Sequence, residues 1–454
     1  MQFSAKNQKL LITAAFFITP LITTPALAVD LVGVHDLAIK NDPRLQAAAY
    51  RKEATAENKT QAWSNLLPSL TGSASIGRGT SDIEVSSKSI SNSDIDSESY
   101  GVDLRQSLYD QRNYEQLDVA RGQISQAEAI YNQAYQDFLV RVADSYFQVL
   151  TASDGVIYVE AEEKALQRQY EQAEQRFEVG LTAVTDVHEA RASYDNARAR
   201  AIVQRNVLAD TLEGLYELTG QYFDDVEPLR EELPLVAPMP ESAAEWVDIA
   251  MTYNPTIVAA VSEVEIADST VRLQRSGHYP TLDLVGKYNR FTNNNYILRD
   301  DFQNVIGTTD LVSTDTTYGL QLQVPIYSGG AVSSRTRQSR SLLNAVNEDL
   351  DQAQRAVARQ TNNAYRGVIA GIEQVGAFQQ AMVSAESALE ATQAGFEVGT
   401  RTIVDVLIAQ QRYFQAQRDN SLARHTYIVD HLRLKAAAGV LQVEDLQKVN
   451  EILE

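Results

Sequence analysis

The sequence contains no cysteine among its 454 residues. This absence excludes disulfide bonds, thiolate metal sites and cysteine nucleophiles. It also excludes an N-terminal cysteine that could carry a lipid anchor. Neither cysteine chemistry nor a disulfide framework therefore contributes to the fold or the function.

Long apolar runs are also missing once the N-terminus is set aside. Lys6 and Lys9 precede an apolar run from Leu10 to Ile22, and Ala26-Leu27-Ala28 is a small-x-small cleavage site. This pattern predicts a signal peptide over residues 1–28, with a retained N-terminal anchor as the alternative. No later apolar run reaches about 18 residues, so no transmembrane helix is expected. If the chain enters a membrane, it must do so as a β-barrel.

Basic charge and catalytic motifs are scarce. The chain has 39 basic and 60 acidic residues, a net charge of −21, and loss of the two signal lysines makes it −23 (37 minus 60). Nucleic acid is therefore not expected as a partner. There is no phosphate loop and no HExxH motif, and the five histidines are scattered. We expect no enzymatic activity, no metal site and no cofactor.

Proline is absent where it would interrupt helices. None of the 11 prolines lies between Pro68 and Pro228 or after Pro325. Because proline breaks helix interiors, each stretch can hold a very long helix. The first, from Gln111 to Gly180, would extend about 105 Å. Apolar residues recur there at heptad spacing, at Leu117, Ile124, Tyr131 and Phe138, as in a coiled coil or an ordinary bundle core.

The chain also repeats itself. Phe177-Glu178-Val179-Gly180 recurs as Phe396-Glu397-Val398-Gly399, at an offset of 219 in sequence number (396 minus 177). The matched helix starts Asp42-Pro43 and Asn254-Pro255 have an offset of 212 (254 minus 42). We predict one structural repeat over residues 29–226 and another over 241–454, joined by a Pro-rich connector at 227–240. Each repeat has a strand hairpin (68–109; 280–327) and then a long helical hairpin (110–220; 328–439), and the second ends in a short C-terminal segment.

The strand hairpins alternate apolar and polar residues, from Tyr100 to Leu108 and from Tyr318 to Ile326. This alternation fits membrane strands with lipid outside and water inside, and it fits a soluble antiparallel sheet with one wet face. The polar stretches Thr80 to Ser97 and Asn293 to Ser313 are predicted to be long outward loops, which favours the membrane interpretation. Four strands cannot close a barrel in lipid, so an oligomer is required, and three copies would give 12 strands.

Several long motifs now point to one family. They are Gln175-Arg176-Phe177-x-Val179-Gly180-Leu181 with Thr185-Asp186-Val187, Val398-Gly399-Thr400-Arg401-Thr402-Ile403-Val404-Asp405, Pro280-Thr281-Leu282-Asp283-Leu284, and Pro325-Ile326-Tyr327-x-Gly329-Gly330. Together they resemble the TolC family of outer-membrane channel proteins, from about Asp30 to Leu453. Since no lipid-bearing cysteine is present, the chain is more similar to the unlipidated members of that family.

The resemblance implies a mixed, mainly α fold. Three chains would form a long coiled-coil α-helical barrel continuous with a 12-stranded transmembrane β-barrel, four strands per chain, girdled by an equatorial belt of mixed α/β structure. It implies a homotrimer in outer-membrane lipid with a periplasmic extension. The function implied is the exit duct of tripartite drug efflux and type I secretion systems. The implied partners are a periplasmic adaptor protein and an inner-membrane RND, ABC or MFS transporter.

The resemblance also implies a gate at the inner mouth, held closed by polar links between helical hairpins. Thr185, Asp186 and Arg401 match positions that carry these links in the family. Asp405 matches an acidic ring that favours cations. The turn glycines of the tips where an adaptor would dock are Gly180 and Gly399.

Two positions depart from the family pattern. Phe396 replaces a tyrosine, which removes a hydroxyl link to Asp186. Ile408 replaces a second acidic residue, but Glu189 stands at the equivalent position of the other hairpin (408 minus 219). Asp186 and Glu189 are three residues apart and share a helix face. Our hypothesis is that Glu189 restores the negative charge of the mouth; the alternative is that it faces solvent outside.

Two other functions share some of these features. A trimeric surface adhesin or coiled-coil spacer, anchored by a small β-barrel, would have the strands and long helices but would not need two matched turns with Asp and Arg. A soluble periplasmic scaffold would fractionate without detergent.

Overall fold

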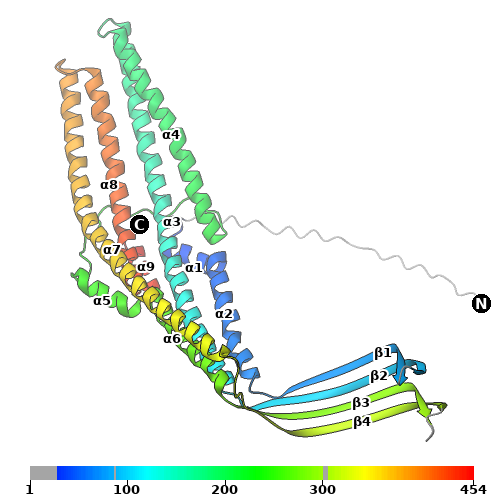
Figure 1. Cartoon of the computed structure of the whole chain (residues 1–454). Coiled ribbons are helices and arrows are strands. Elements are labelled where there is room, and N and C mark those ends of the chain that lie inside the picture. The colour runs from blue at the N-terminus through cyan, green and yellow to red at the C-terminus, as the bar shows by residue number, and fades with distance from the viewer. Residues whose placement is uncertain (1–27, 86–87, 300–304, 454) are drawn as a thin grey trace, which may run out of the picture.

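The computed structural model describes residues 28–85, 88–299 and 305–453. The predicted signal peptide, apart from Ala28, lies outside the described residues. Two long helical hairpins extend toward one end of the molecule, and a curved sheet lies at the other end (Figure 1). The predicted mainly helical fold with strand hairpins is confirmed.

The same order of elements occurs twice along the chain. The first half contains α1 (Leu31–Asn41), α2 (Pro43–Ser64), β1 (Ser69–Val85), β2 (Lys88–Tyr109), α3 (Gln111–Glu178) and α4 (Val184–Thr219). The second half contains α5 (Ala243–Tyr253), α6 (Pro255–Arg275), the 3-10 turn η1 (Ser276–His278), β3 (Thr281–Arg299), β4 (Val305–Gln323), α7 (Ala331–Glu397), α8 (Ile403–Ala437) and α9 (Val443–Asn450).

The two predicted helix starts are capped as expected. The Asp42 carboxylate accepts hydrogen bonds from the backbone N–H groups of the first turn of α2, and Asn254 accepts one from Thr256 N at 2.9 Å at the start of α6. Proline follows each cap, where its missing N–H costs nothing. The same local chemistry therefore begins the second helix of each half.

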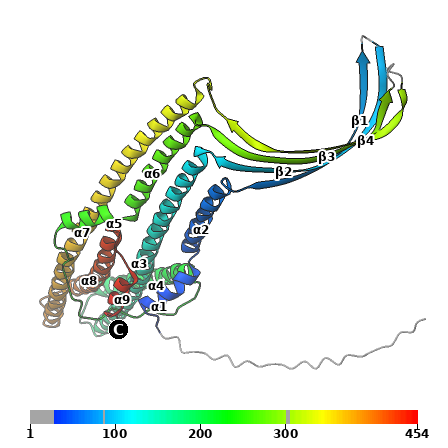
Figure 2. The same cartoon turned by 90° about the horizontal axis from the view of Figure 1, so that it is seen from below.

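The helices α3 and α7 contain 68 and 67 residues, so each is about 100 Å long. Figure 2 shows α2, α3, α6 and α7 running together toward the sheet, and these neighbours pack against one another. In the predicted heptad stripe of α3, Leu117 and Phe138 are buried, and Ile124 and Tyr131 are half-buried. None of the described helices carries an apolar stretch long enough to cross a bilayer.

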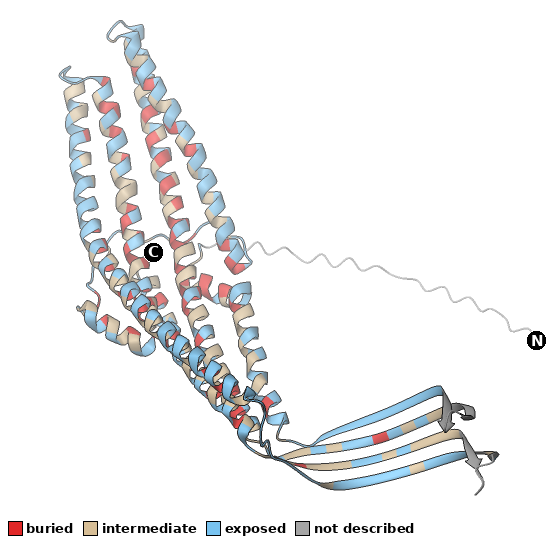
Figure 3. Cartoon of the chain, viewed as in Figure 1, coloured by how far each residue is buried: buried red, intermediate tan, exposed pale blue. Residues whose placement is uncertain are grey.

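The main core surrounds the middle of α3 and the C-terminal part of α8 (Figure 3). Leu31 of α1, Phe138 and Tyr146 of α3, Leu434 of α8 and Leu446 of α9 are all fully buried there. The Tyr146 hydroxyl donates to the backbone oxygen of Glu227 in the connector, at 2.8 Å. The first helix, the connector and the last helix are thus packed around the long hairpins.

The described strands form one antiparallel sheet in the order β1-β2-β3-β4. The prediction of long loops at Thr80–Ser97 and Asn293–Ser313 is wrong. Most of both stretches continues the strands, with pairs such as Thr80↔Asp94 and Asn293↔Leu311. The prediction followed side-chain polarity, whereas antiparallel pairing joins backbone groups and continues through polar sequence.

The sheet has one apolar face that none of the described residues of the chain covers. Tyr318, Leu320 and Ile326, in and just after β4, are 88%, 66% and 94% exposed. The alternate positions are polar, and across β2 and β3 Arg105 pairs with Asp283 at 2.7 Å. The predicted alternation is therefore present, with an uncovered apolar face opposite a polar one.

Candidate functional site at the two helical turns

The α3–α4 and α7–α8 turns lie at the end of the molecule opposite the sheet (Figure 1). Gly180 and Gly399 have positive φ angles, 76° and 81°. In each turn the residue after the glycine donates its N–H to the carbonyl five residues earlier, at 2.8 Å; the pairs are Leu181 with Arg176 and Thr400 with Gly395. This geometry ends a helix with a left-handed residue, which glycine adopts without steric cost.

The first turn supplies Asp186 with a partner inside the chain. The Thr182 hydroxyl donates to the Asp186 carboxylate. The N-cap of α4 is Ala183, which offers no side-chain hydrogen bond to the helix start. Thr185 and Glu189 are exposed on the first turns of α4, and neither side chain makes a hydrogen bond within the described residues.

The second turn supplies Asp405 with a different partner. Asp405 and Thr402 form a reciprocal capping box: Thr402 N–H donates to Asp405 Oδ2 at 2.9 Å, and Asp405 N–H donates to Thr402 Oγ1 at 3.2 Å. These hydrogen bonds, helped by the nearby Arg401, hold the pKa of the Asp405 carboxyl below its usual range. Asp405 is therefore ionised at neutral pH and stabilises the start of α8.

The Arg401 side chain is exposed and forms no ion pair or hydrogen bond within the part of the chain that the structure describes, and its backbone N–H donates to the Gly395 carbonyl at 3.2 Å. Its side chain instead lies across Gly395 at the end of α7: a Cβ atom at residue 395 would stand 2.8 Å from Arg401 Cγ. The link between Arg401 and Asp186, or Arg401 and Thr185, that the sequence suggested is not formed within one chain.

The two hairpins meet near the turns through a contact that the sequence analysis missed. The Arg176 guanidinium lies over the ring of Phe396, 4.6 Å from its centre. Below it is a small apolar cluster that includes Leu166, Ala190 and Ile403. Phe396, noted only for its missing hydroxyl, thus offers its ring face to a cation. One sequence feature marks this site: Arg176 in the first copy of the repeat corresponds to Gly395 in the second (176 plus 219).

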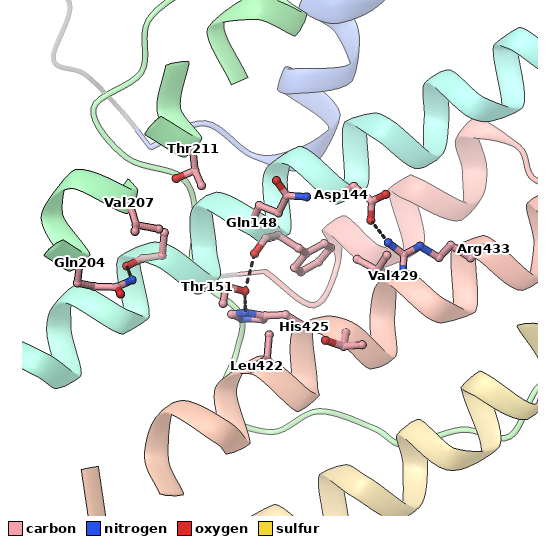
Figure 4. Close-up of a pocket in the computed structure, with 13 residues that line it drawn as sticks. Asp144, Gln148, Thr151, Gln204, Val207, Thr211, Leu422, His425, Val429 and Arg433 are labelled. Carbon is pink, nitrogen blue, oxygen red and sulfur yellow. Dashed lines mark hydrogen bonds and ion pairs between the residues drawn. The ribbon is translucent and has the colours of Figure 1, made fainter. Parts of the chain in front are cut away.

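A cluster of polar side chains lies farther from the turns, between α3, α4 and α8 (Figure 4). Thr151 Oγ1 and His425 Nδ1 are 2.9 Å apart, and His425 Nε2 is 3.8 Å from Asp154. Thr151 donates its hydroxyl proton to the carbonyl of Phe147 at 2.7 Å, so it accepts from His425 and is not oriented as a nucleophile. Burial lowers the pKa of His425 to about 4.

Thr151 and His425 border a cavity of about 340 Å³, where Arg433 pairs with Asp144 at 2.9 Å. These hydrogen bonds and ion pairs satisfy polar side chains where the two hairpins meet. The described side chains here are not arranged as a nucleophile with its base. Among the described residues, no cluster of three or more His, Asp or Glu side chains is placed to hold a metal ion.

Comparison with solved structures defines the class of fold. The chain superposes on the Campylobacter jejuni CmeC outer membrane channel with a TM-score of 0.75 at 16% identity, covering 98% of each chain. It superposes on the Vibrio cholerae outer membrane protein VceC with a TM-score of 0.72 at 18% identity, covering 90% of this chain and 96% of the other. The fold is that of an outer-membrane channel.

Sequence comparison gives the family. The profile described as outer membrane efflux protein matches residues 34–221 and 246–440. The chain belongs to this family, and the resemblance to TolC is confirmed. It is 36% identical to outer membrane protein TolC of Vibrio cholerae over 94% of this chain and 95% of the relative. It is 32% identical to TolC of Escherichia coli, over 94% and 85%. The alkaline protease secretion protein AprF of Pseudomonas aeruginosa is 29% identical, over 94% and 88%. The chain is an outer-membrane channel of the efflux and secretion type.

Proposed function

We propose that three copies of the chain assemble into a gated exit duct. The strands β1 and β4 are the edges of the four-stranded sheet within one chain. Unpaired edges are not tolerated in lipid. Three sheets joined edge to edge would give a 12-stranded β-barrel with residues such as Tyr318 and Leu320 facing lipid.

In this assembly the helical hairpins form the wall of a periplasmic duct. The duct passes substrates outward and has no catalytic activity of its own. A periplasmic adaptor docks at the exposed turns around Gly180 and Gly399, where Leu181 and Val398 present apolar surface that is 76% and 75% exposed. An inner-membrane RND, ABC or MFS transporter supplies the energy. The family description, outer membrane efflux protein, and the name of one relative, a protease secretion protein, support a role in efflux and secretion, which we assign to drug efflux and type I secretion systems.

The gate lies at the same turns. The observation that carries this proposal is that Arg401 is exposed and has no ion-pair partner among the described residues of its own chain. Arg401 lies in the second turn, and Asp186 follows the equivalent first turn. In the trimer Arg401 would pair with Thr185 and Asp186 of a neighbouring chain. A partly exposed pair of this kind contributes about 1 kcal/mol or less, so adaptor binding could open three of them. Asp405, with Glu189 beside Asp186, would make the mouth negative.

The test is the conductance of the purified trimer in a planar bilayer. A gated duct gives a small resting conductance that rises when links at the turns are removed. An adhesin, a spacer or a soluble scaffold gives no channel conductance, and that result would contradict the proposal.

A further inference from the structure

Glu162, in the last quarter of α3, is a carboxylate with no solvent-exposed surface. Each of its oxygens binds a different arginine. Oε1 accepts from Arg200 Nη2 at 2.7 Å, and Oε2 accepts from Arg418 Nη1 at 3.2 Å. Arg200 belongs to α4, the partner of α3 in the first hairpin, and Arg418 belongs to α8 in the second. One buried carboxylate thus joins three helices; we call these three residues the Glu162 clamp.

The two arms of the clamp have different structural consequences. The bond to Arg200 lies within one hairpin, whereas the bond to Arg418 crosses between hairpins. A buried carboxylate is costly when it has no partner. If the hairpins separate, Glu162 keeps Arg200 and is never left unpaired. The arm to Arg418 can therefore break without stranding a charge, which makes it suited to a reversible contact.

The position of the clamp along the helices matters for the turns. Glu162 lies 16 residues before the end of α3 at Glu178 (178 minus 162). Arg418 lies 16 residues after Thr402, the N-cap of α8 (418 minus 402). Both are therefore about 24 Å from the turns. Farther from the turns, the seam between α3 and α8 has other polar contacts, from Asp154 to Ser421 and from Thr151 to His425.

Closer to the turns the character of this seam changes. Within the described ranges, no ion pair or hydrogen bond joins the two hairpins between the clamp and the turns. The contacts there are the apolar cluster around Leu166 and Ile403 and the Arg176–Phe396 contact. The Arg418–Glu162 bond is thus, among the described residues, the last directional hydrogen-bonded contact before the turns.

We propose that Glu162 is a positioning residue of the gate: through Arg418 it fixes the separation of the two hairpins and thereby the placement of Arg401 relative to Asp186. This inference rests on the proposed gate function. Charge-assisted hydrogen bonds are directional, so they set a distance that apolar contacts alone leave free to slide. Loss of the Arg418 arm lets the hairpins part beyond the clamp and opens the resting duct.

The test compares two single substitutions on the same carboxylate, Arg418→Met and Arg200→Met. Each keeps an apolar side chain of similar length and removes one arm. Resting conductance is measured in a planar bilayer, with Arg401→Ala as the reference for an opened gate. Arg418→Met should raise resting conductance toward the level of Arg401→Ala, by up to about fivefold. Arg200→Met should leave it near the wild-type value, and Arg418→Lys should restore most of the closure.

A second measurement reports hairpin separation directly. Because the chain has no cysteine, Leu181→Cys and Val398→Cys can carry spin labels in trimers diluted with unlabelled chains. Arg418→Met should lengthen and broaden the distance between the labels, and Arg200→Met should not. Recovery of folded trimer for each variant, measured by its mass in detergent, controls for misfolding.

The two proposals fail in different ways. If Arg401→Ala raises conductance but Arg418→Met changes neither conductance nor label distance, the clamp proposal is overturned and the gate stands. If Arg418→Met and Arg200→Met lengthen the distance equally, Glu162 has only a structural role and the proposal is again overturned. If neither Arg401→Ala nor Arg418→Met changes conductance while the distance lengthens, the gate fails and the positioning of the hairpins by Glu162 is supported.

Discussion

Arg401 occupies in the second turn the position that Thr182 occupies in the first (401 minus 219). The Thr182 hydroxyl donates to Asp186 within its own helix start, whereas the Arg401 side chain has no hydrogen-bond or ion-pair partner in the described part of its chain. The first turn therefore satisfies its carboxylate internally, and the second leaves a cation exposed. The repeat preserves the shape of the turns while their polar partners differ, and this asymmetry makes a link between chains possible.

The turn glycines should be intolerant of a side chain because of backbone conformation. Gly399 has a φ of 81°, and a Cβ added there would meet no atom within 4 Å, so space is not the obstacle. Gly399→Ala should destabilise the protein by about 1 kcal/mol. Gly376, inside α7 with equally open surroundings, is the matched control, and Gly376→Ala should stabilise by about 0.5–1 kcal/mol. Helix unfolding followed by circular dichroism checks both. Equal midpoints for the two variants would show that the turn does not need glycine.

Gly395 should matter for a different reason, because it leaves room for Arg401. A Cβ at residue 395 would approach Arg401 Cγ to 2.8 Å, so Gly395→Ala must displace the Arg401 side chain. We expect a partial copy of the Arg401→Ala conductance phenotype with helix stability preserved. Gly376→Ala again serves as the control. Wild-type conductance in Gly395→Ala would mean that the resting place of Arg401 does not affect closure.

Glu189 tests the charge of the mouth. It is exposed on the same helix face as Asp186, and the hypothesis is that it lines the entrance. Glu189→Ala should then weaken divalent-cation block of single-channel current by up to about fivefold, the limit for an exposed ionic contact. Asp405→Ala is the positive control for loss of block. Unchanged block in Glu189→Ala, with block reduced in the control, would place Glu189 on the outer surface.

The buried imidazole of His425 should make stability depend on pH. Burial lowers the pKa of His425 from 6.5 to about 4, so between these values the unfolded chain binds a proton that the folded chain does not. The neutral imidazole therefore contributes at most roughly 3 kcal/mol to the free energy of unfolding. This contribution is fully present above about pH 6.5 and is lost as the pH falls toward 4. Burial also raises the pKa of Asp154, and this carboxyl offsets part of the loss at the acid end.

Replacing the imidazole checks this dependence. His425→Gln should flatten the fall in unfolding midpoint between pH 6.5 and 4, while its midpoint at pH 7.5 drops modestly because the contact with Thr151 is weakened. The comparison uses thermal unfolding of the detergent-solubilised protein. An unchanged pH slope would show that another group dominates acid destabilisation.

Local sequence rules were sufficient for much of this architecture. Proline spacing, capping residues such as Asp42 and the turn glycines depend on neighbours along the chain, so the long hairpins and their ends could be predicted. The resemblance supplied the gate candidates. The strands beyond Thr80 were missed because backbone pairing does not require apolar side chains.

Contacts between hairpins could not be predicted in the same way. Arg176 over Phe396, and Glu162 between Arg200 and Arg418, depend on which helix faces meet and at what axial level. A glutamate in a long acidic helix is usually solvent-exposed, and nothing in the residues around Glu162 indicates that its carboxylate is fully buried. Only the packing of α3 against both α4 and α8 brings its partners together.

The central claim is that Arg401 holds a resting duct closed, and single-channel conductance of the purified trimer with Arg401→Ala tests it most directly. Loss of about 1 kcal/mol or less per link predicts a rise in resting conductance of up to about fivefold for each link broken. Arg401→Lys should fall between this variant and the wild type, because lysine keeps the charge but not the bidentate geometry. Raising the salt concentration should reduce the difference, since an exposed pair is screened. A resting conductance in Arg401→Ala equal to that of the wild type would contradict the account.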